Sequence, residues 1–164
     1  MELQNGYLVG IPPSTWLPKL CCKIVGAKTF HWLMLVGRDP KGWMCSESIN
    51  KGTALTRFNY DKAYIYKIKN IPEPSMYKLI SIHSWHGWCE YDNLVNFRTA
   101  IWFILKHYLK IIIPVIHNHK FNCQEHVVYM ASCLGAQIIS QSDYPYCRNL
   151  EKSSMLEYIG EWRQ

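Results

Sequence analysis

The sequence predicts an α+β fold in which a small antiparallel sheet or half-barrel packs against helices. Short apolar stretches of strand character, separated by turn sequences, follow one another in the first half of the chain. Two other segments, 16–25 and 123–134, carry apolar residues at helical spacing. The 164 residues suffice for one ordinary hydrophobic core and are too few for two. We therefore expect one domain over residues 1–164.

Composition narrows the classes of function. Hydrophobic residues make up 49% and charged residues 18% of the chain, which is typical of a folded globule. The net charge of +6 comes from lysines and arginines that are scattered singly, without a run of like sign. This spacing disfavours a nucleic-acid groove, so we expect no nucleic-acid partner.

The number of cysteines and the hydropathy of the chain indicate the cellular compartment in which the protein is expected. The chain has seven cysteines and no recognisable secretory segment, which predicts free thiols in a reducing, cytoplasmic compartment. The longest apolar run, 100–116, is interrupted by Lys106, His107 and Lys110. It therefore predicts a core helix followed by a buried strand, and no transmembrane segment.

The first elements follow from turn and helix signals. Residues 6–11 form a short apolar run closed by two prolines, which predicts a strand. Apolar residues then recur at helical spacing over 16–25, and Gly26 ends this helix. Residues 30–37 are continuously apolar and predict a second strand. The segment 38–42 has turn chemistry, so 43–49 should return as the antiparallel partner.

The rest of the chain adds further strands and helices. Residues 53–58 form a short extended piece, and 61–68 alternate polar and apolar residues as a half-buried strand does. Helices are predicted over 76–83 and over 91–108. After the helix that starts at residue 123, the segment 143–154 is irregular, and a short closing helix runs through Tyr158.

His31 and Glu47 lie on the two strands of the predicted hairpin. A histidine near the start of an apolar strand is either a satisfied core residue or a catalytic base. A hairpin of this length brings Glu47 within side-chain reach of His31, where the carboxylate would orient the imidazole and stabilise its charged form. A solvated strand position is the alternative for Glu47.

Cys123 opens the helix that ends near Gly135. The unpaired N–H groups and the positive end of the helix dipole favour a thiolate there, which makes Cys123 a candidate for covalent catalysis. The alternative is a small buried hydrophobic residue.

Histidines and cysteines also raise the question of a metal. The pattern His83-x-x-His86-x-x-Cys89 places two imidazoles on one helix face with a thiolate nearby, as a zinc site would require. A convincing fourth ligand is missing nearby: His117, His119 and His126 could supply one, but they follow no known ligand spacing. We therefore assign no metal and no cofactor.

These motifs together resemble the circularly permuted NlpC-type papain-like cysteine hydrolases. In that group the histidine strand precedes the cysteine helix, whereas other papain-like enzymes place the cysteine first. The resemblance covers most of the chain and rests on a strand histidine with Gly37 behind it, Glu47-x-x-x-x-Gly52, Tyr91-Asp92, the Cys123 helix, an opening strand at 5–10 and a closing segment at 149–154.

Two departures and one related branch bear on the substrate. Tyr7 stands where the family usually has aspartate, and Gln124 where it has serine after the nucleophile. The sequences Asn122-Cys123 and Phe30-His31-Trp32 are similar to the lecithin-retinol-acyltransferase-like branch. That branch has a second histidine on the return strand, where this chain has Glu47, so the amidase or peptidase branch is favoured.

The resemblance implies a permuted papain-like fold and a triad in which Cys123 is the nucleophile, His31 the general base and acid, and Glu47 the residue that orients His31. The Cys123 backbone N–H would stabilise the oxyanion. The expected activity is hydrolysis of a peptide-like amide bond. The alternatives are a thiol acyltransferase or lipid hydrolase with an acyl substrate, and a non-catalytic or zinc-binding module that retains the fold.

Overall fold

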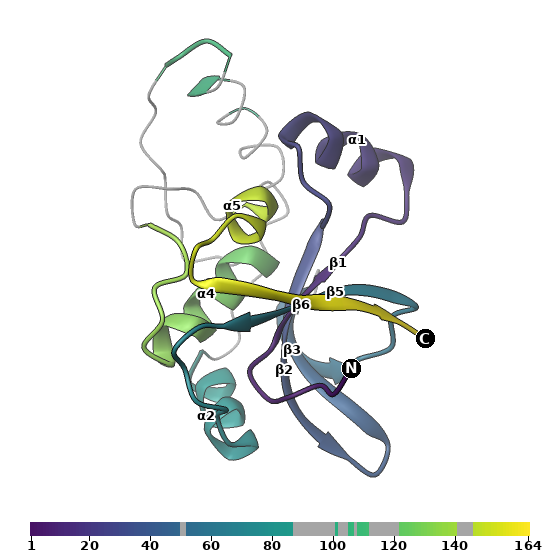
Figure 1. Ribbon diagram of the computed structural model, residues 1–164, viewed down its shortest axis with the longest axis vertical. Helices are drawn as coiled ribbons and strands as arrows, with labels where there is room; N and C mark the ends of the chain where they lie inside the picture. Colours follow the sequence, from purple (N-terminus) through teal and green to yellow (C-terminus); the bar gives the residue numbers. More distant parts are fainter. Residues whose placement is uncertain (50–51, 87–100, 102–104, 107, 112–121, 141–145) are drawn as a thin grey trace.

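Six strands form one antiparallel sheet in the order β4-β3-β2-β1-β5-β6 (Figure 1). The computed structural model describes residues 1–49, 52–86, 101, 105–106, 108–111, 122–140 and 146–164. The strands are β1 (Leu8–Ile11), β2 (His31–Asp39), β3 (Gly42–Ile49), β4 (Gly52–Arg57), β5 (Lys62–Ile68) and β6 (Leu156–Arg163). The helices are α1 (Trp16–Val25), α2 (Met76–His86), α4 (Cys123–Cys133) and α5 (Cys147–Glu151).

The predicted fold class is confirmed. Each pair of neighbouring strands is antiparallel, and α2 and α4 pack against the sheet. The strand order is linear, with β4 and β6 at the two edges, so the sheet is open and is not closed into a barrel.

The hairpin of β2 and β3 fixes which side chains share a face. Leu33 pairs with Glu47, and a register shift lies between Leu35 and Gly37. His31 is two residues before Leu33, so it points to the same face as Leu33 and is a diagonal neighbour of Glu47. The register of this hairpin therefore sets the approach of these two polar side chains.

Gly37 allows α2 to approach the sheet closely. A Cβ atom at this position would lie 2.5 Å from the Cγ atom of Met76, the first residue of α2. Because that distance is far below van der Waals contact, a larger residue here would require the Met76 side chain to move.

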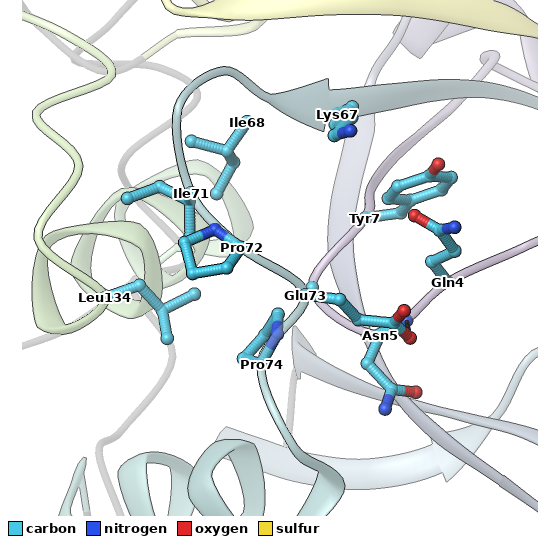
Figure 2. A pocket seen from close by; sticks show the side chains of 11 residues that line it. Gln4, Asn5, Tyr7, Lys67, Ile68, Ile71, Pro72, Glu73, Pro74 and Leu134 are labelled. Atoms are coloured by element: carbon cyan, nitrogen blue, oxygen red, sulfur yellow. Dashed lines mark hydrogen bonds between the residues drawn. The ribbon is translucent and has the colours of Figure 1, made fainter.

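A cavity of about 230 Å³ lies beside the C-terminal end of α4 (Figure 2). Residues before β1, at the end of β5 and after it line the cavity, among them Tyr7, Lys67 and Glu73, and Leu134 contributes from the end of α4. The eleven residues of α4 rise by about 16 Å in total. The cavity therefore lies at the end of α4 that is opposite to its first residue.

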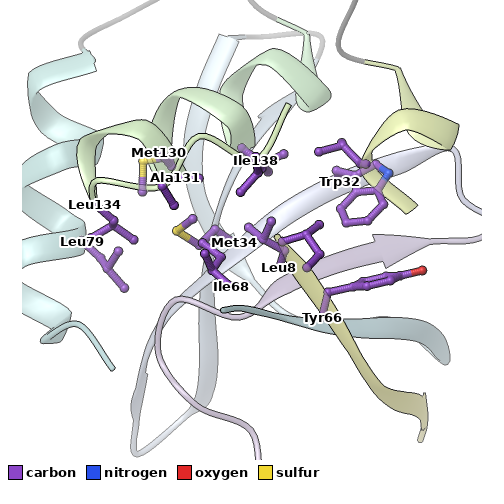
Figure 3. Close-up of a cluster of buried hydrophobic side chains, with 14 of the residues drawn as sticks. Leu8, Trp32, Met34, Tyr66, Ile68, Leu79, Met130, Ala131, Leu134 and Ile138 are labelled. Atoms are coloured by element: carbon purple, nitrogen blue, oxygen red, sulfur yellow. The ribbon is translucent and has the colours of Figure 1, made fainter. Parts of the chain in front are cut away.

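Apolar side chains cover both faces of the central strands. One cluster lies between the sheet and the helices (Figure 3) and includes Trp32 and Met34 of β2. A second cluster lies on the opposite face and includes Leu33 and Leu35. Successive residues of β2 therefore enter different clusters, which explains why its sequence is continuously apolar.

The prediction for the C-terminus is wrong. Instead of a closing helix through Tyr158, the chain forms the short helix α5 and then the edge strand β6. Strand β6 pairs with β5 along its length, and the rings of Tyr158 and Tyr66 lie 5.5 Å apart. Cross-strand pairing with a distant segment decided the structure here, and local periodicity cannot reveal such pairing.

Two predictions on the middle of the chain stay predictions. The helix over 91–108 and the buried strand at the end of 100–116 lie almost wholly outside the described residues. Within the part that the structure describes, no helix is both long and apolar enough to cross a bilayer.

Candidate active site

Cys123 is the first residue of α4, and a complete capping box fixes this helix start. The Asn122 side chain accepts a hydrogen bond from the backbone N–H of Glu125 at 2.8 Å. The Glu125 carboxylate in turn accepts one from the backbone N–H of Asn122 at 3.0 Å. Because the cap uses the N–H of Glu125, the N–H groups of Cys123 and Gln124 remain at the open end of the helix without intrahelical partners.

His31 and Glu47 form a close pair. His31 Nε2 lies 2.6 Å from Glu47 Oε2, and the Glu47 side chain is only 6% exposed. Two further side chains hold the carboxylate, since Thr56 donates to Oε1 and Tyr60 donates to Oε2 at 3.1 Å. Glu47 is thus a buried acceptor with three side-chain partners.

The electrostatics of the pair favour charge on both groups. Burial alone would raise the pKa of Glu47, but the hydrogen bonds from His31 and Thr56 outweigh it and hold this pKa below 4.5. Burial alone would lower the pKa of His31, but its interactions with Cys123 and then with Glu47 raise this pKa well above 6.5. The surroundings of the pair therefore favour a carboxylate at Glu47 and stabilise the imidazolium of His31 once the ring has accepted a proton.

The carbonyl oxygen of Phe30 joins the start of α4 to β2. It accepts a hydrogen bond from Gln124 Nε2 at 3.1 Å and one from Cys147 Sγ at 3.3 Å. Cys123 Sγ lies 4.0 Å from the same oxygen. One peptide group next to His31 therefore positions the helix that carries Cys123.

Three other cysteines are buried thiols. Burial raises the pKa of Cys22 to about 11 and that of Cys45 to about 12. Burial also raises the pKa of Cys147 well above its ordinary value. These thiols stay protonated at neutral pH and are poor nucleophiles.

A second polar group joins β3 to α2 and α4. Ser46 Oγ lies 2.7 Å from His83 Nδ1 and 2.7 Å from His126 Nε2. Ser46 and His126 are fully buried, and burial lowers the pKa of His83. The hydroxyl thus ties both helices to the sheet, away from the pair of His31 and Glu47.

Ser46→Ala is expected to lower the free energy of unfolding by about 1–3 kcal/mol, because the buried imidazole of His126 and the half-buried imidazole of His83 lose the hydroxyl between them. Urea unfolding at neutral pH measures the effect, and Ser81→Ala, an exposed serine of α2, is the matched control. Equal stability of the two variants would show that the bridge contributes nothing.

The zinc hypothesis for His83, His86 and Cys89 stays a prediction. Cys89 and the side chain of His86 lie outside the described residues, and His83 Nδ1 is bonded to Ser46. Among the residues that the structure does describe, no group of three or more histidine, cysteine or acidic side chains is arranged to hold a metal ion.

Comparison with known proteins shows a likeness in fold to a solved structure. No protein-family model matches the chain, and no curated protein does. Among solved structures, the chain is similar to the metalloprotein YiiX from Escherichia coli O157:H7. The TM-score is 0.54 with 13% identity, over 98% of each chain. At this identity the likeness shows a shared α+β fold.

The structure thus brings together the three side chains that the sequence singled out as a triad. Reasoning from the sequence missed the residues that hold them, namely Thr56, Tyr60, Phe30 and Gln124. Reasoning from the sequence also missed the cap, although the Asn122-x-x-Glu125 pattern is a signal of a capping box. Gln124, a departure from the family pattern, has a definite contact because its amide also lies 2.9 Å from Cys147 Sγ.

Glu47→Gln should slow turnover while substrate affinity stays near normal, because Glu47 contacts His31 and lies behind it. The stability difference from wild type should be largest between about pH 4.5 and 6.5. Because the pKa of Glu47 is lowered on folding, its carboxylate contributes its full stability above about pH 4.5, the value for the unfolded chain. Because the pKa of His31 is raised on folding, its imidazolium contributes its full stability below about pH 6.5, and both contributions are complete only between these two values.

Steady-state kinetics and urea unfolding across pH measure these effects. Asp39→Asn is the matched control, since it neutralises a partly exposed carboxylate of the same hairpin, paired with Arg57. A pH-independent stability difference with an unchanged rate would remove Glu47 from the site.

Proposed function

We propose that the chain is a thiol hydrolase of the permuted NlpC-type papain-like kind, an amidase or peptidase that cleaves a peptide-like amide bond. One observation carries the proposal. Cys123 stands at a capped helix N-terminus and interacts with His31, whose imidazole is held on its other side by the buried carboxylate of Glu47. This is the arrangement that activates a cysteine nucleophile.

The ring nitrogens of His31 have separate tasks. Glu47 accepts the hydrogen bond of Nε2, which leaves Nδ1 to take the proton of the Cys123 thiol. Glu47 thereby fixes the tautomer and stabilises the imidazolium that forms, as the acidic member of a catalytic triad does. Because Glu47 has three side-chain partners, it holds the imidazole in one orientation.

The reaction follows from these positions. Cys123 Sγ gives its proton to His31 Nδ1 and attacks the substrate carbonyl carbon. The negative charge that develops on the carbonyl oxygen is stabilised by the backbone N–H of Cys123. His31 then returns the proton to the leaving amine, the C–N bond breaks, and a thioester remains. A water molecule deprotonated by His31 attacks the thioester and releases the acid and the free thiol.

A second candidate is a thiol acyltransferase or lipid hydrolase. In acyl transfer, a nucleophile other than water attacks the thioester, with the same three residues in the same roles. The observation that favours this candidate is the exposed apolar side of α1, the helix that directly precedes the strand of His31. The activity would then be directed at an acyl ester.

The proposal is tested by the rate at which iodoacetamide alkylates each cysteine, read by mass spectrometry at several pH values. At neutral pH, Cys123 should react faster than exposed Cys133, which is on the same helix. The advantage should disappear in His31→Ala, because the base is then missing. The buried thiols of Cys22, Cys45 and Cys147 serve as unreactive internal references.

Equal reactivity of Cys123 and Cys133 in both proteins would contradict the proposal and would favour a non-catalytic or zinc-binding module. If the reactivity is as expected, peptide amides and acyl esters presented to the wild type distinguish the two candidate activities. Accumulation of an acyl group on Cys123 identifies the accepted substrate class.

A further inference from the structure

Helix α1 exposes a stripe of large apolar side chains. Trp16 is 74% exposed, Leu17 53%, Leu20 45% and Ile24 41%. Soluble surfaces commonly carry such residues singly, whereas four of them on a helix of ten residues form a continuous patch. We refer to these four residues as the α1 stripe.

Helical geometry explains why the stripe faces outward. Trp16, Leu20 and Ile24 are spaced four apart, and Leu17 falls beside them. Cys22 lies on the opposite side of the helix, where it is buried and its thiol donates to the carbonyl oxygen of Thr29. The helix is therefore anchored through the face away from the stripe. Figure 1 shows α1 beyond the end of the sheet.

Positive charge borders the stripe. Lys19 and Lys23 are exposed on α1, and Lys28 is exposed shortly after it. No aspartate or glutamate occurs between residues 3 and 38 of the sequence. From outside this segment, Arg148 donates to the carbonyl oxygen of Val25 at 3.3 Å, which adds a cation at the end of α1.

One acidic group does approach this region from α5. The carboxylate of Glu151 accepts hydrogen bonds from the backbone N–H groups of Lys28 and Thr29 and from the Thr29 hydroxyl. It is thus directed at the loop after α1 and not at the lysines of the helix. The surface of α1 itself combines apolar and cationic side chains without an acidic one.

We propose that α1 is an interfacial helix that docks the protein on an anionic phospholipid bilayer. The stripe would enter the boundary between headgroups and acyl chains, and Lys19 and Lys23 would contact lipid phosphates. Tryptophan and lysine are residues suited to that boundary. With ten residues, α1 is far too short to span the membrane and would lie in its plane.

Docking of this kind would bring the candidate active site near the lipid surface. The chain leaves α1 at Gly26 and enters β2 at His31, and the loop between them carries the Phe30 carbonyl that positions α4. The inference does not depend on the chemistry proposed for Cys123. Membrane binding is a property of α1, and it should persist when the nucleophile is absent.

Flotation with phospholipid vesicles tests the proposal. The full chain should float with phosphatidylcholine vesicles containing about a third phosphatidylserine, and much less with phosphatidylcholine alone. Trp16→Ser should weaken binding about tenfold through lost apolar burial. Lys19→Gln and Lys23→Gln should each weaken it about fivefold, with a shallower salt dependence.

Trp85→Ser is the matched control, because Trp85 is 86% exposed on α2. This variant and Cys123→Ala should bind vesicles as the wild type does. Absence of flotation, or equal binding of Trp16→Ser and Trp85→Ser, would overturn the proposal. So would a Trp16→Ser variant that changes only the oligomeric state in sedimentation, since the stripe would then join two copies of the chain.

Discussion

Cys123→Ala is expected to lower hydrolysis by about 10³-fold or more and to abolish formation of an acyl-enzyme, while the protein stays folded. The substitution removes the only atom of the protein that bonds to the substrate carbon in the proposed reaction. It leaves the cap of Asn122 and Glu125 intact, so the cost in free energy of unfolding should be no more than about 1–2 kcal/mol. Intact-mass spectrometry after incubation with an activated ester, together with urea unfolding, measures both effects.

Cys133→Ala serves as the control, because Cys133 is an exposed cysteine at the other end of the same helix. This variant should retain both the rate and the acyl adduct. A Cys123→Ala protein that unfolds would identify Cys123 as a structural residue, and one that keeps full activity would place the nucleophile elsewhere.

His31→Ala is expected to lower the rate of hydrolysis by about 10²–10⁴-fold, because the enzyme then lacks both its general base and its general acid. The loss should be partly reversed by added imidazole, since the His31 side chain is 21% exposed and its removal leaves a space that reaches solvent. Rescue should rise with pH through the pKa of free imidazole, as the neutral form is the one that accepts the proton. Rates at increasing imidazole concentration measure this recovery.

Glu47→Gln provides the comparison for the rescue experiment. That variant keeps the imidazole of His31, so added imidazole should not restore its rate. Equal rescue of both variants would indicate a general solvent effect. A His31→Ala protein with the wild-type rate would show that another group accepts the proton.

Much of the fold could be predicted from the sequence because its strands and helices depend on signals between residues close together in the chain. The turn at 38–42 and the flanking apolar runs predict the β2–β3 hairpin, and its register then places Glu47 near His31. The start of α4 at Cys123 could be predicted for the same reason, since apolar residues at helical spacing begin directly after this cysteine.

The missed features depend on contacts between distant segments. Strand β6 forms because its residues pair with β5, and nothing in their own spacing separates this outcome from a short helix. Thr56 and Tyr60 reach Glu47 only because β4 folds back beside β3. The contact of Gln124 with the Phe30 carbonyl likewise joins residues far apart in the chain. Such partners cannot be found from composition or periodicity.

The Phe30 carbonyl, which accepts hydrogen bonds from Gln124 and Cys147, affects how the distance between Cys123 and His31 responds to changes in chain length. Because the base is the next residue after this carbonyl, and the nucleophile helix is fastened to it through Gln124, one peptide unit serves as a common reference point for both. The separation of Cys123 from His31 is therefore set locally. It should be insensitive to insertions or deletions in the turns between β2 and α4, provided that the strands keep their register and α2 keeps its packing.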